Sequence, residues 1–192
     1  MKSLEEKILS EGKVLPGNIL KVGSFLNHQL DVDFLLEMGK EIDRLFKDCG
    51  VNKIVTIESS GIAIAVAAAA VMHVPVVFAK KNKTSNISEG VYSSMVHSFT
   101  HGTDYKVVIS NEFLSDRDNI IIVDDFLALG NALNGLLDIA SQAGAKVSGV
   151  AIAIEKGFQG GGDKLREKGI RVESLAIIDS MDSGSLTFRR QD

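Results

Sequence analysis

Two adjacent carboxylates, Asp124 and Asp125, stand where an apolar run gives way to a short loop and the start of a helix. The run before them is Ile-Ile-Ile-Val, and the stretch after them, Phe-Leu-Ala-Leu-Gly-Asn-Ala, carries one glycine. Carboxylates at the end of a strand can accept hydrogen bonds from the vicinal hydroxyls of a ribose, and amides that open a helix can cradle an anion. The pattern predicts a site for a ribose 5-phosphate. The alternative is that the aspartates only cap the helix or turn the chain.

A second loop, Glu58-Ser59-Ser60-Gly61, also lies between an apolar run and an expected helix. Its hydroxyls and free amides at a helix start suit a pyrophosphate. Serine before a helix is also an ordinary N-cap, so this loop taken alone has a purely structural interpretation.

A ribose 5-phosphate is a part of nucleotides, and two further regions could contact a base that belongs with the sugar. Lys156 follows the apolar run at residues 147–154, where its ammonium could donate to an exocyclic purine oxygen and Phe158 could add an aromatic contact. The segment at residues 19–30 mixes apolar residues with the amide of Asn27, as the cover of a pocket would. A surface lysine and ordinary packing are the structural alternatives.

The elements that must position these residues alternate along the chain, short β-branched runs with helical stretches, from about residue 54 onward. Uninterrupted apolar runs such as 120–123 are typical of strands buried on both faces. The sequence therefore predicts an α/β fold with a doubly wound, mainly parallel sheet, in which ligands bind at the carboxyl ends of the strands. We expect helices at 3–11, 32–47, 61–72 and 130–143, and strands at 54–57, 74–79, 105–110, 119–123, 147–154 and 172–178.

Length and composition indicate one globular domain over residues 1–192, with roughly residues 1–30 outside the alternating region. A chain with 45% hydrophobic and 24% charged residues is not intrinsically disordered. The net charge of −4 argues against a nucleic-acid partner, and the single cysteine, Cys49, fits a reducing, cytoplasmic setting. The apolar stretch at 61–79 is built on alanine and broken by His73 and Pro75, so no membrane span is predicted.

Motifs for metals and other nucleotide chemistry are missing from the sequence. The four histidines show no ligand spacing, and one cysteine cannot form a zinc set, so no metal site of the protein's own is predicted. The sequence has no Walker A motif and no G-x-G-x-x-G after a strand. Gly160-Gly161-Gly162 is interpreted as a flexible turn.

The segment at residues 80–104 is long, polar and rich in Ser and Thr, with three lysines near its start. A loop of that length in a compact chain is usually functional or mobile. The alternative is a solvated hairpin without a role.

The stretch at residues 120–132 resembles the thirteen-residue signature of type I phosphoribosyltransferases: a hydrophobic strand, two acids, two hydrophobic residues and a small-residue loop with glycine. Many members have threonines beside that glycine, where this chain has Leu129 and Asn131. In that family, a loop in the position of 58–61 holds a diphosphate. A segment in the position of 80–104 closes over the active site, which shields a ribosyl cation-like centre from water.

Further motifs, in the same order, resemble bacterial xanthine phosphoribosyltransferases from about residue 12 to about residue 178: ILKVxxFLNHQ, KIVTIESSGIA, SFT, LSDxDxIIIVDDFLAxG and IEKxFQ. The resemblance implies that three residues contact xanthine: Leu20, Asn27 and Lys156. It implies that the 5-phosphate of phosphoribosyl pyrophosphate (PRPP) is held by Ala128, Leu129, Gly130, Asn131 and Ala132. The diphosphate is then held by Glu58, Ser59, Ser60 and Gly61, and by Lys81 from the neighbouring subunit of a homodimer.

Two positions depart from the pattern of the resembled family. Ile64 replaces a usual proline, and Leu129 replaces a usual asparagine in the phosphate loop. Because backbone amides bind the phosphate there, we expect the second change to be tolerated.

The activity implied by this resemblance is transfer of phosphoribosyl from PRPP to xanthine in purine salvage, with magnesium carried on PRPP. Asp124 and Asp125 would orient the ribose and offset its developing positive charge, and residues 1–30 would form a small hood over the base. One alternative is a transferase for adenine, hypoxanthine or guanine. Another is a regulator that senses PRPP and binds DNA, but its added DNA-reading module and basic face do not fit 192 residues at a net charge of −4.

Overall fold

The computed structural model describes residues 1–82, 90–98, 103–182 and 185–191. Within them, an eight-stranded sheet has the strand order β10-β9-β8-β7-β3-β4-β6-β5. Neighbouring strands from β9 through β4 pair in parallel, whereas β10, β6 and β5 pair antiparallel at the two sides. The predicted α/β class with a mainly parallel sheet is confirmed. The strands are β3 (Lys53–Ile57), β4 (Val76–Asn82), β5 (Val91–Ser98), β6 (Thr103–Ser110), β7 (Asn119–Leu127), β8 (Lys146–Lys156), β9 (Val172–Asp182) and β10 (Ser185–Phe188).

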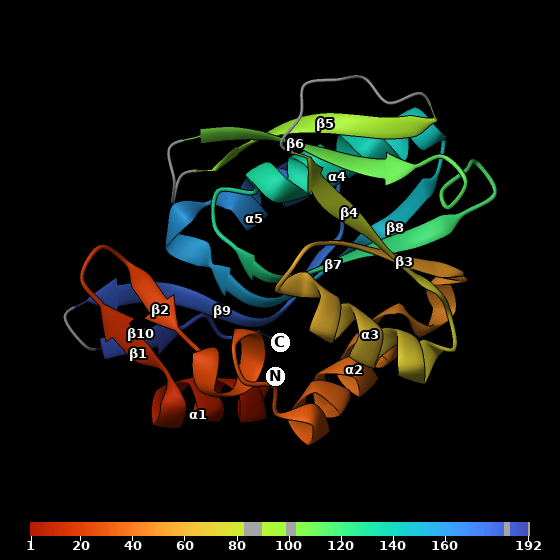
Figure 1. Ribbon diagram of the computed structural model, residues 1–192. Helices are drawn as coiled ribbons and strands as arrows, with labels where there is room; N and C mark the ends of the chain where they lie inside the picture. Colours follow the sequence, from red (N-terminus) through yellow and green to blue (C-terminus); the bar gives the residue numbers. More distant parts are fainter. Residues whose placement is uncertain (83–89, 99–102, 183–184, 192) are drawn as a thin grey trace.

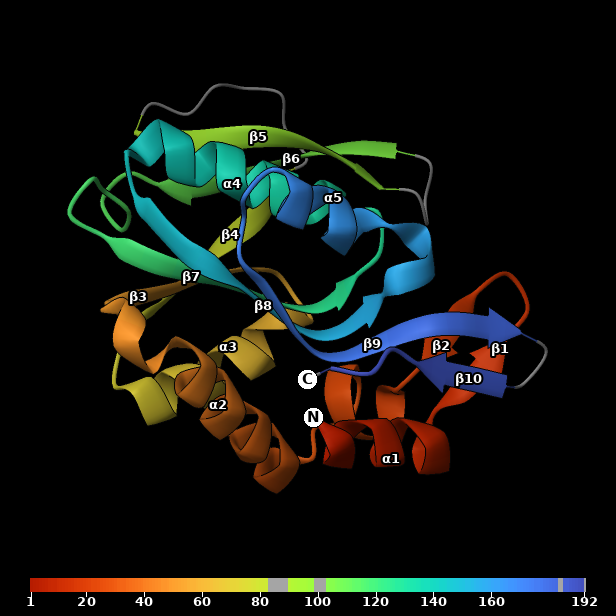
Figure 2. The same cartoon turned by 180° about the vertical axis from the view of Figure 1, so that it is seen from behind.

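Helices cover both faces of this sheet (Figures 1 and 2). α2 (Val32–Phe46) and α3 (Gly61–Met72) lie on one face, and α4 (Asn131–Ala143) and α5 (Gly161–Glu167) lie on the other. The middle strand β7 is apolar toward both: Ile121 and Val123 join the core beside α2 and α3, and Ile120 and Ile122 join the core beside α4. Burial on both faces explains the unbroken apolar run that identified this strand in the sequence.

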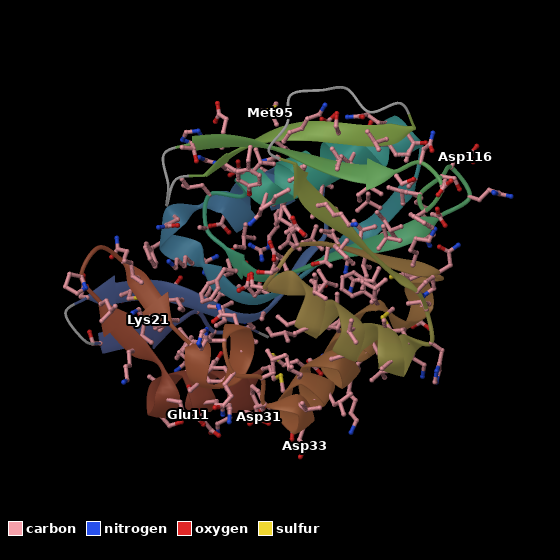
Figure 3. All side chains as sticks on the ribbon, in the orientation of Figure 1. Glu11, Lys21, Asp31, Asp33, Met95 and Asp116 are labelled. Atoms are coloured by element: carbon pink, nitrogen blue, oxygen red, sulfur yellow. The ribbon has the colours of Figure 1, made fainter. Side chains whose placement is uncertain are left out.

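The N-terminal region lies beside the side of the sheet formed by β9 and β10. It contains α1 (Lys2–Glu11), the antiparallel strands β1 (Lys13–Leu15) and β2 (Ile19–Lys21), and a π-helical turn, η1 (Gly23–Asn27). Both views place β1 and β2 next to β9 and β10 (Figures 1 and 2). Its buried residues share one core with α2, while charged side chains such as Glu11, Lys21 and Asp31 lie at the periphery of the molecule (Figure 3). The region is therefore packed onto the sheet by its own apolar face.

The segment at 80–104 differs from the expected loop. Its described residues apart from Gly90, which lies in a turn, belong to strands: 80–82 end β4, 91–98 form β5, and 103–104 begin β6. Residues 83–89 and 99–102 lie outside the described residues, and so does that part of the predicted lid. The loop prediction is wrong for the described part because an edge strand needs no apolar run when backbone hydrogen bonds hold it. β6 supplies these on one side, and on the other the Gln142 side chain donates to Ser93 O (2.9 Å) and accepts from Ser93 N–H (3.2 Å).

Candidate functional site

A cavity of about 560 Å³ opens at the carboxyl ends of β7 and β8. It is bounded by the turn between β1 and β2, by β5 and β6, and by the loop that joins β7 to α4. Four segments line it: residues 17–19; Val96, His97 and Tyr105; Asp124 and residues 126–133; and Lys156 with Gln159. The position agrees with the rule that parallel sheets bind ligands beyond the carboxyl ends of their strands.

The two aspartates lie inside β7, not after it. The strand continues to Leu127 because β8 runs alongside and pairs with it through Phe126 and Leu127. The boundary predicted at residue 123 is therefore wrong, since four apolar residues mark only the part of the strand that is buried on both faces. Asp124 and Asp125 are 6% and 7% exposed. Asp125 N–H donates to Asp124 Oδ1 (3.0 Å), and Phe126 N–H donates to Asp125 Oδ1 (2.9 Å).

The electrostatics of this pair favour a positively charged ligand. Burial, and then the charge of Asp125, raise the pKa of Asp124 well above its usual range, while the charge of Lys81 opposes the rise. Burial and the charge of Asp124 also raise the pKa of Tyr105. A cationic centre near the pair would relieve the repulsion between the two carboxylates. The arrangement is suited to stabilising positive charge as it develops on a bound group.

The predicted phosphate loop, residues 128–132, lines the cavity along its whole length. Gly130 has a φ of +86°, and its carbonyl accepts the N–H of Asn134 (2.9 Å) in the first turn of α4. Backbone amides therefore open the helix at the cavity, as an anion site requires. Asn131 lies at this helix start, and its Nδ2 donates to His97 O on β5 (3.0 Å). Leu129 stands in the loop as part of the lining.

Gly161, the first residue of α5, packs against the phosphate loop, a contact that the sequence interpretation missed. Its N–H donates to Ala128 O (3.2 Å), and a Cβ at Gly161 would lie 2.7 Å from the carbonyl carbon of Leu129. Such a contact is too short for any side chain, so only glycine lets the two backbones approach. The prediction of a flexible turn at 160–162 is wrong for Gly161 and Gly162, which are buried and begin α5. No spacing pattern in the sequence signals this contact between distant segments.

The second loop, residues 58–61, borders the aspartate pair. A Cβ on Gly61 would lie 2.8 Å from Asp124 Oδ1, so the start of α3 is packed directly against that carboxyl group. Glu58 Oε1 accepts the N–H of Lys81 (2.5 Å) and so ties the loop to β4. The Lys81 ammonium lies 5.3 Å from the centre of the Tyr105 ring. Ser59 is exposed and Ser60 directly precedes α3. The structure thus brings the two predicted phosphate-binding loops to one edge of the sheet.

Two of the three predicted base contacts reach this region. Lys156 lines the cavity, where its Nζ donates to Asn18 O (2.8 Å) and lies 5.7 Å from the centre of the Phe126 ring. Burial lowers the pKa of Lys156. Asn27 Nδ2 donates to Asp125 Oδ2 (3.1 Å), which connects η1 to the aspartate pair.

Leu20, the third predicted base contact, lies buried in the core with α1 and does not line the cavity. Its neighbours Asn18 and Ile19 line the cavity instead. Phe126 is the aromatic ring beside the ammonium of Lys156, whereas Phe158, for which the sequence suggested an aromatic contact with the base, does not line the cavity. The sequence carried a weak signal for Phe126, since it directly follows the acidic pair.

In the part of the chain that the structure describes, no three His, Cys, Asp or Glu side chains gather as metal ligands. In the same residues, no helix is long and apolar enough to cross a membrane.

Comparison with known proteins identifies the family. Residues 31–180 match the model of the phosphoribosyl transferase domain. The chain is 53% identical over 190 residues to xanthine phosphoribosyltransferase 1 of Clostridium perfringens, with 98% of this chain and 100% of that protein covered. It is 50% identical over 192 residues to xanthine phosphoribosyltransferase of Bacillus cereus, with 100% and 98% covered. The resemblance inferred from the motifs is confirmed.

Solved structures support the fold. Adenine phosphoribosyltransferase from Rhodothermus marinus superposes with a TM-score of 0.73 at 18% identity, covering 92% of this chain and 99% of that one. The enzyme from Giardia lamblia, solved with 9-deazaadenine, gives a TM-score of 0.73 at 19% identity, covering 91% and 96%. At these identities the likeness extends to the fold alone.

Proposed function

This chain belongs to the phosphoribosyl transferase family, and on that premise we propose that it transfers the phosphoribosyl group of PRPP to xanthine, forming xanthosine 5′-monophosphate and pyrophosphate. Relatives that carry this name are 50–53% identical over nearly the whole chain. The structural observation that carries the proposal is one cavity that joins Asp124, the loop at 128–132 and the ammonium of Lys156. A ribose, a phosphate and an oxopurine each find a complementary group there.

Asp124 and Asp125 act on the ribose. The bond from the anomeric carbon to pyrophosphate breaks as the bond to a base nitrogen forms, through a transition state with oxocarbenium character. The two carboxylates accept hydrogen bonds from ribose hydroxyls and offset the positive charge on the ring. Their burial strengthens this effect, because charges interact more strongly away from water.

The two loops hold the phosphates of PRPP. Amides of residues 128–132 bind the 5-phosphate, and Gly161 keeps that loop in place from α5. The loop at 58–61 holds the magnesium diphosphate. This chain's own Lys81 ammonium lies against the Tyr105 ring, and we expect the Lys81 that reaches the diphosphate to come from the neighbouring subunit of a homodimer. Magnesium suits phosphate and water oxygens, and on the diphosphate it supplies positive charge to the leaving group.

Lys156 and Asn27 orient the base. An ammonium has only donors, so Lys156 matches the 6-oxygen of an oxopurine and not the 6-amino group of adenine. Asn27 Nδ2 has a second hydrogen beyond the one donated to Asp125, and this hydrogen serves the 2-oxygen that distinguishes xanthine from hypoxanthine. Residues 1–30, including Leu20, form a hood over the base as part of a single domain, and we expect the enzyme to act in the cytoplasm.

A direct assay tests the activity. The purified protein is incubated with PRPP, magnesium and one base at a time, and the nucleotide is identified by mass. We expect xanthosine 5′-monophosphate to form fastest, hypoxanthine and guanine to react more slowly, and adenine not to react. Preferential formation of another nucleotide would overturn the assignment of xanthine, and no nucleotide from any base would overturn the proposed activity.

A further inference from the structure

Thr56 carries a buried hydroxyl for which the fold provides no partner. The residue belongs to β3 and is fully buried. Among the described residues, its Oγ1 is the buried side-chain atom that neither donates nor accepts a hydrogen bond. A buried hydroxyl without a partner destabilises a protein, so its presence calls for an explanation.

The Asp124 carboxyl group lies close to this hydroxyl, because both pack against Gly61. Gly61, the first residue of α3, stands between the two side chains. A Cβ on Gly61 would lie 2.8 Å from Asp124 Oδ1 and closer still to Thr56 Oγ1. A contact this short is a clash, so the two oxygens pack directly against the backbone of Gly61. Any other residue at this position would force one of them to move.

Asp124 is in turn short of hydrogen-bond donors. Its Oδ1 accepts the N–H of Asp125, and the charged or titratable groups that act on it are Asp125 on β7, Lys81 on β4 and Tyr105 on β6. An ionised, buried carboxylate can accept about four hydrogen bonds, and donors to it both fix its orientation and favour its charge. The Thr56 hydroxyl is a donor that packs against Gly61 beside this carboxyl group.

We propose that Thr56 is a positioning residue for Asp124: when PRPP is bound, the Thr56 hydroxyl donates to Asp124 Oδ1 beside Gly61, where no side chain stands between the two oxygens. The inference rests on the proposed function, because it is the ribose that requires an ionised and correctly oriented Asp124. Among the described residues the hydroxyl has no hydrogen-bond partner, and in this proposal a change of rotamer at either side chain brings the donor to Oδ1. The stability lost to the unpartnered hydroxyl of Thr56 is thus linked to the orientation of Asp124 for catalysis.

The test compares Thr56→Val, which keeps the shape and removes the hydroxyl, with Thr56→Ser, which keeps the hydroxyl and removes the methyl group. For Thr56→Val we expect a melting temperature equal to or above that of the wild type, because an unpartnered hydroxyl is lost. We expect its kcat to fall about 10-fold or more, as for a lost hydrogen bond to a charged group. The KM for PRPP should change little, because the loops still bind the phosphates. Thr56→Ser should melt lower and keep most of the wild-type kcat.

A purely structural role for Thr56 gives the opposite ranking, with activity following stability. Wild-type kcat in Thr56→Val, or loss of kcat in a folded Thr56→Ser, would overturn the inference. If Thr56→Val does not fold, Thr56→Ser and Thr56→Ala form a second pair that differs in the hydroxyl alone, and equal kcat values in that pair would overturn it. Failure of the proposed function is distinguishable, because the wild-type protein would then form no nucleotide from any base.

Discussion

Two neighbouring strands each carry a buried carboxyl group toward the carboxyl end, and the two groups have opposite surroundings. Glu155 on β8 is fully buried. Its carboxylate accepts hydrogen bonds from Nη1 and Nη2 of Arg166, at 2.9 and 2.7 Å, and from the hydroxyl of Ser174. Asp124 on β7 has a second carboxylate as its neighbour, and its pKa is raised by burial and by that neighbour. A buried charge is stable when it is paired and bonded, as Glu155 is. The difference separates a carboxylate that belongs to the scaffold from one that is kept for a ligand.

The largest expected effect concerns the paired carboxylate. Arg166→Ala leaves the charge of Glu155 buried without its partner, so we expect the free energy of unfolding to fall by about 3–5 kcal/mol. The matched control is Arg44→Ala. Arg44 makes the same two-nitrogen contact with Glu41 on the exposed surface of α2, where the loss should be about 1 kcal/mol or less. Urea denaturation at pH 7 measures both, and similar losses would remove the distinction between the two sites.

The unpaired carboxylates should show the reverse balance of stability and activity. Asp124→Asn with Asp125→Asn keeps the shape and removes the charge, so kcat should fall about 10²-fold or more. A carboxyl group whose pKa is raised in the folded chain favours folding when protonated, and loses that contribution as the pH rises through this pKa. The melting temperature at pH 7 should therefore stay the same or rise. Asp116→Asn, at an exposed site (Figure 3), is the control that should retain wild-type kcat. Near-normal turnover of the folded double variant would contradict the role of the pair.

A smaller effect is expected where the aspartate pair meets the N-terminal region. Asn27→Ala removes the donor to Asp125 and a donor for the base, so the ratio of kcat/KM for xanthine over hypoxanthine should fall about 10-fold. Lys156→Ala should lower kcat/KM for both bases and keep their ratio, because both carry the 6-oxygen. An unchanged ratio in Asn27→Ala would show that xanthine is selected elsewhere.

The smallest expected effect is a shift in the pH dependence of kcat/KM for PRPP. Because the pKa of Asp124 is raised, kcat/KM for PRPP should decrease on the acid side at a higher pH than an ordinary aspartate would give. Asp125→Asn removes the neighbouring charge, so in that variant the acid limb should move to lower pH. A limb that stays in place would show that another group titrates.

The sequence predicted most of the elements that carry the site, because burial on two faces leaves a clear apolar pattern. The helix at 61–72 and the strand core at 120–123 are examples, and the acidic pair and both loops were found by their place after such strands. The pattern fails where backbone pairing or a side chain from a distant segment decides the structure. β5 is held by β6 and Gln142, the close packing of Thr56 and Asp124 depends on Gly61, and Glu155 depends on Arg166. None of these contacts has a local spacing that sequence inspection could find.

The pairing of Gln142 with Ser93 also bears on how one molecule meets another. β5 is an edge strand, and a row of unpaired amides and carbonyls on such a strand is a template for a strand from a second molecule. The side-chain amide of Gln142 occupies both backbone groups of Ser93, and Asn131 occupies the carbonyl of His97. Side chains of helix α4 therefore make the hydrogen bonds that a neighbouring strand would make at Ser93 and His97. These contacts occupy part of the edge from within the chain, which opposes edge-to-edge aggregation there.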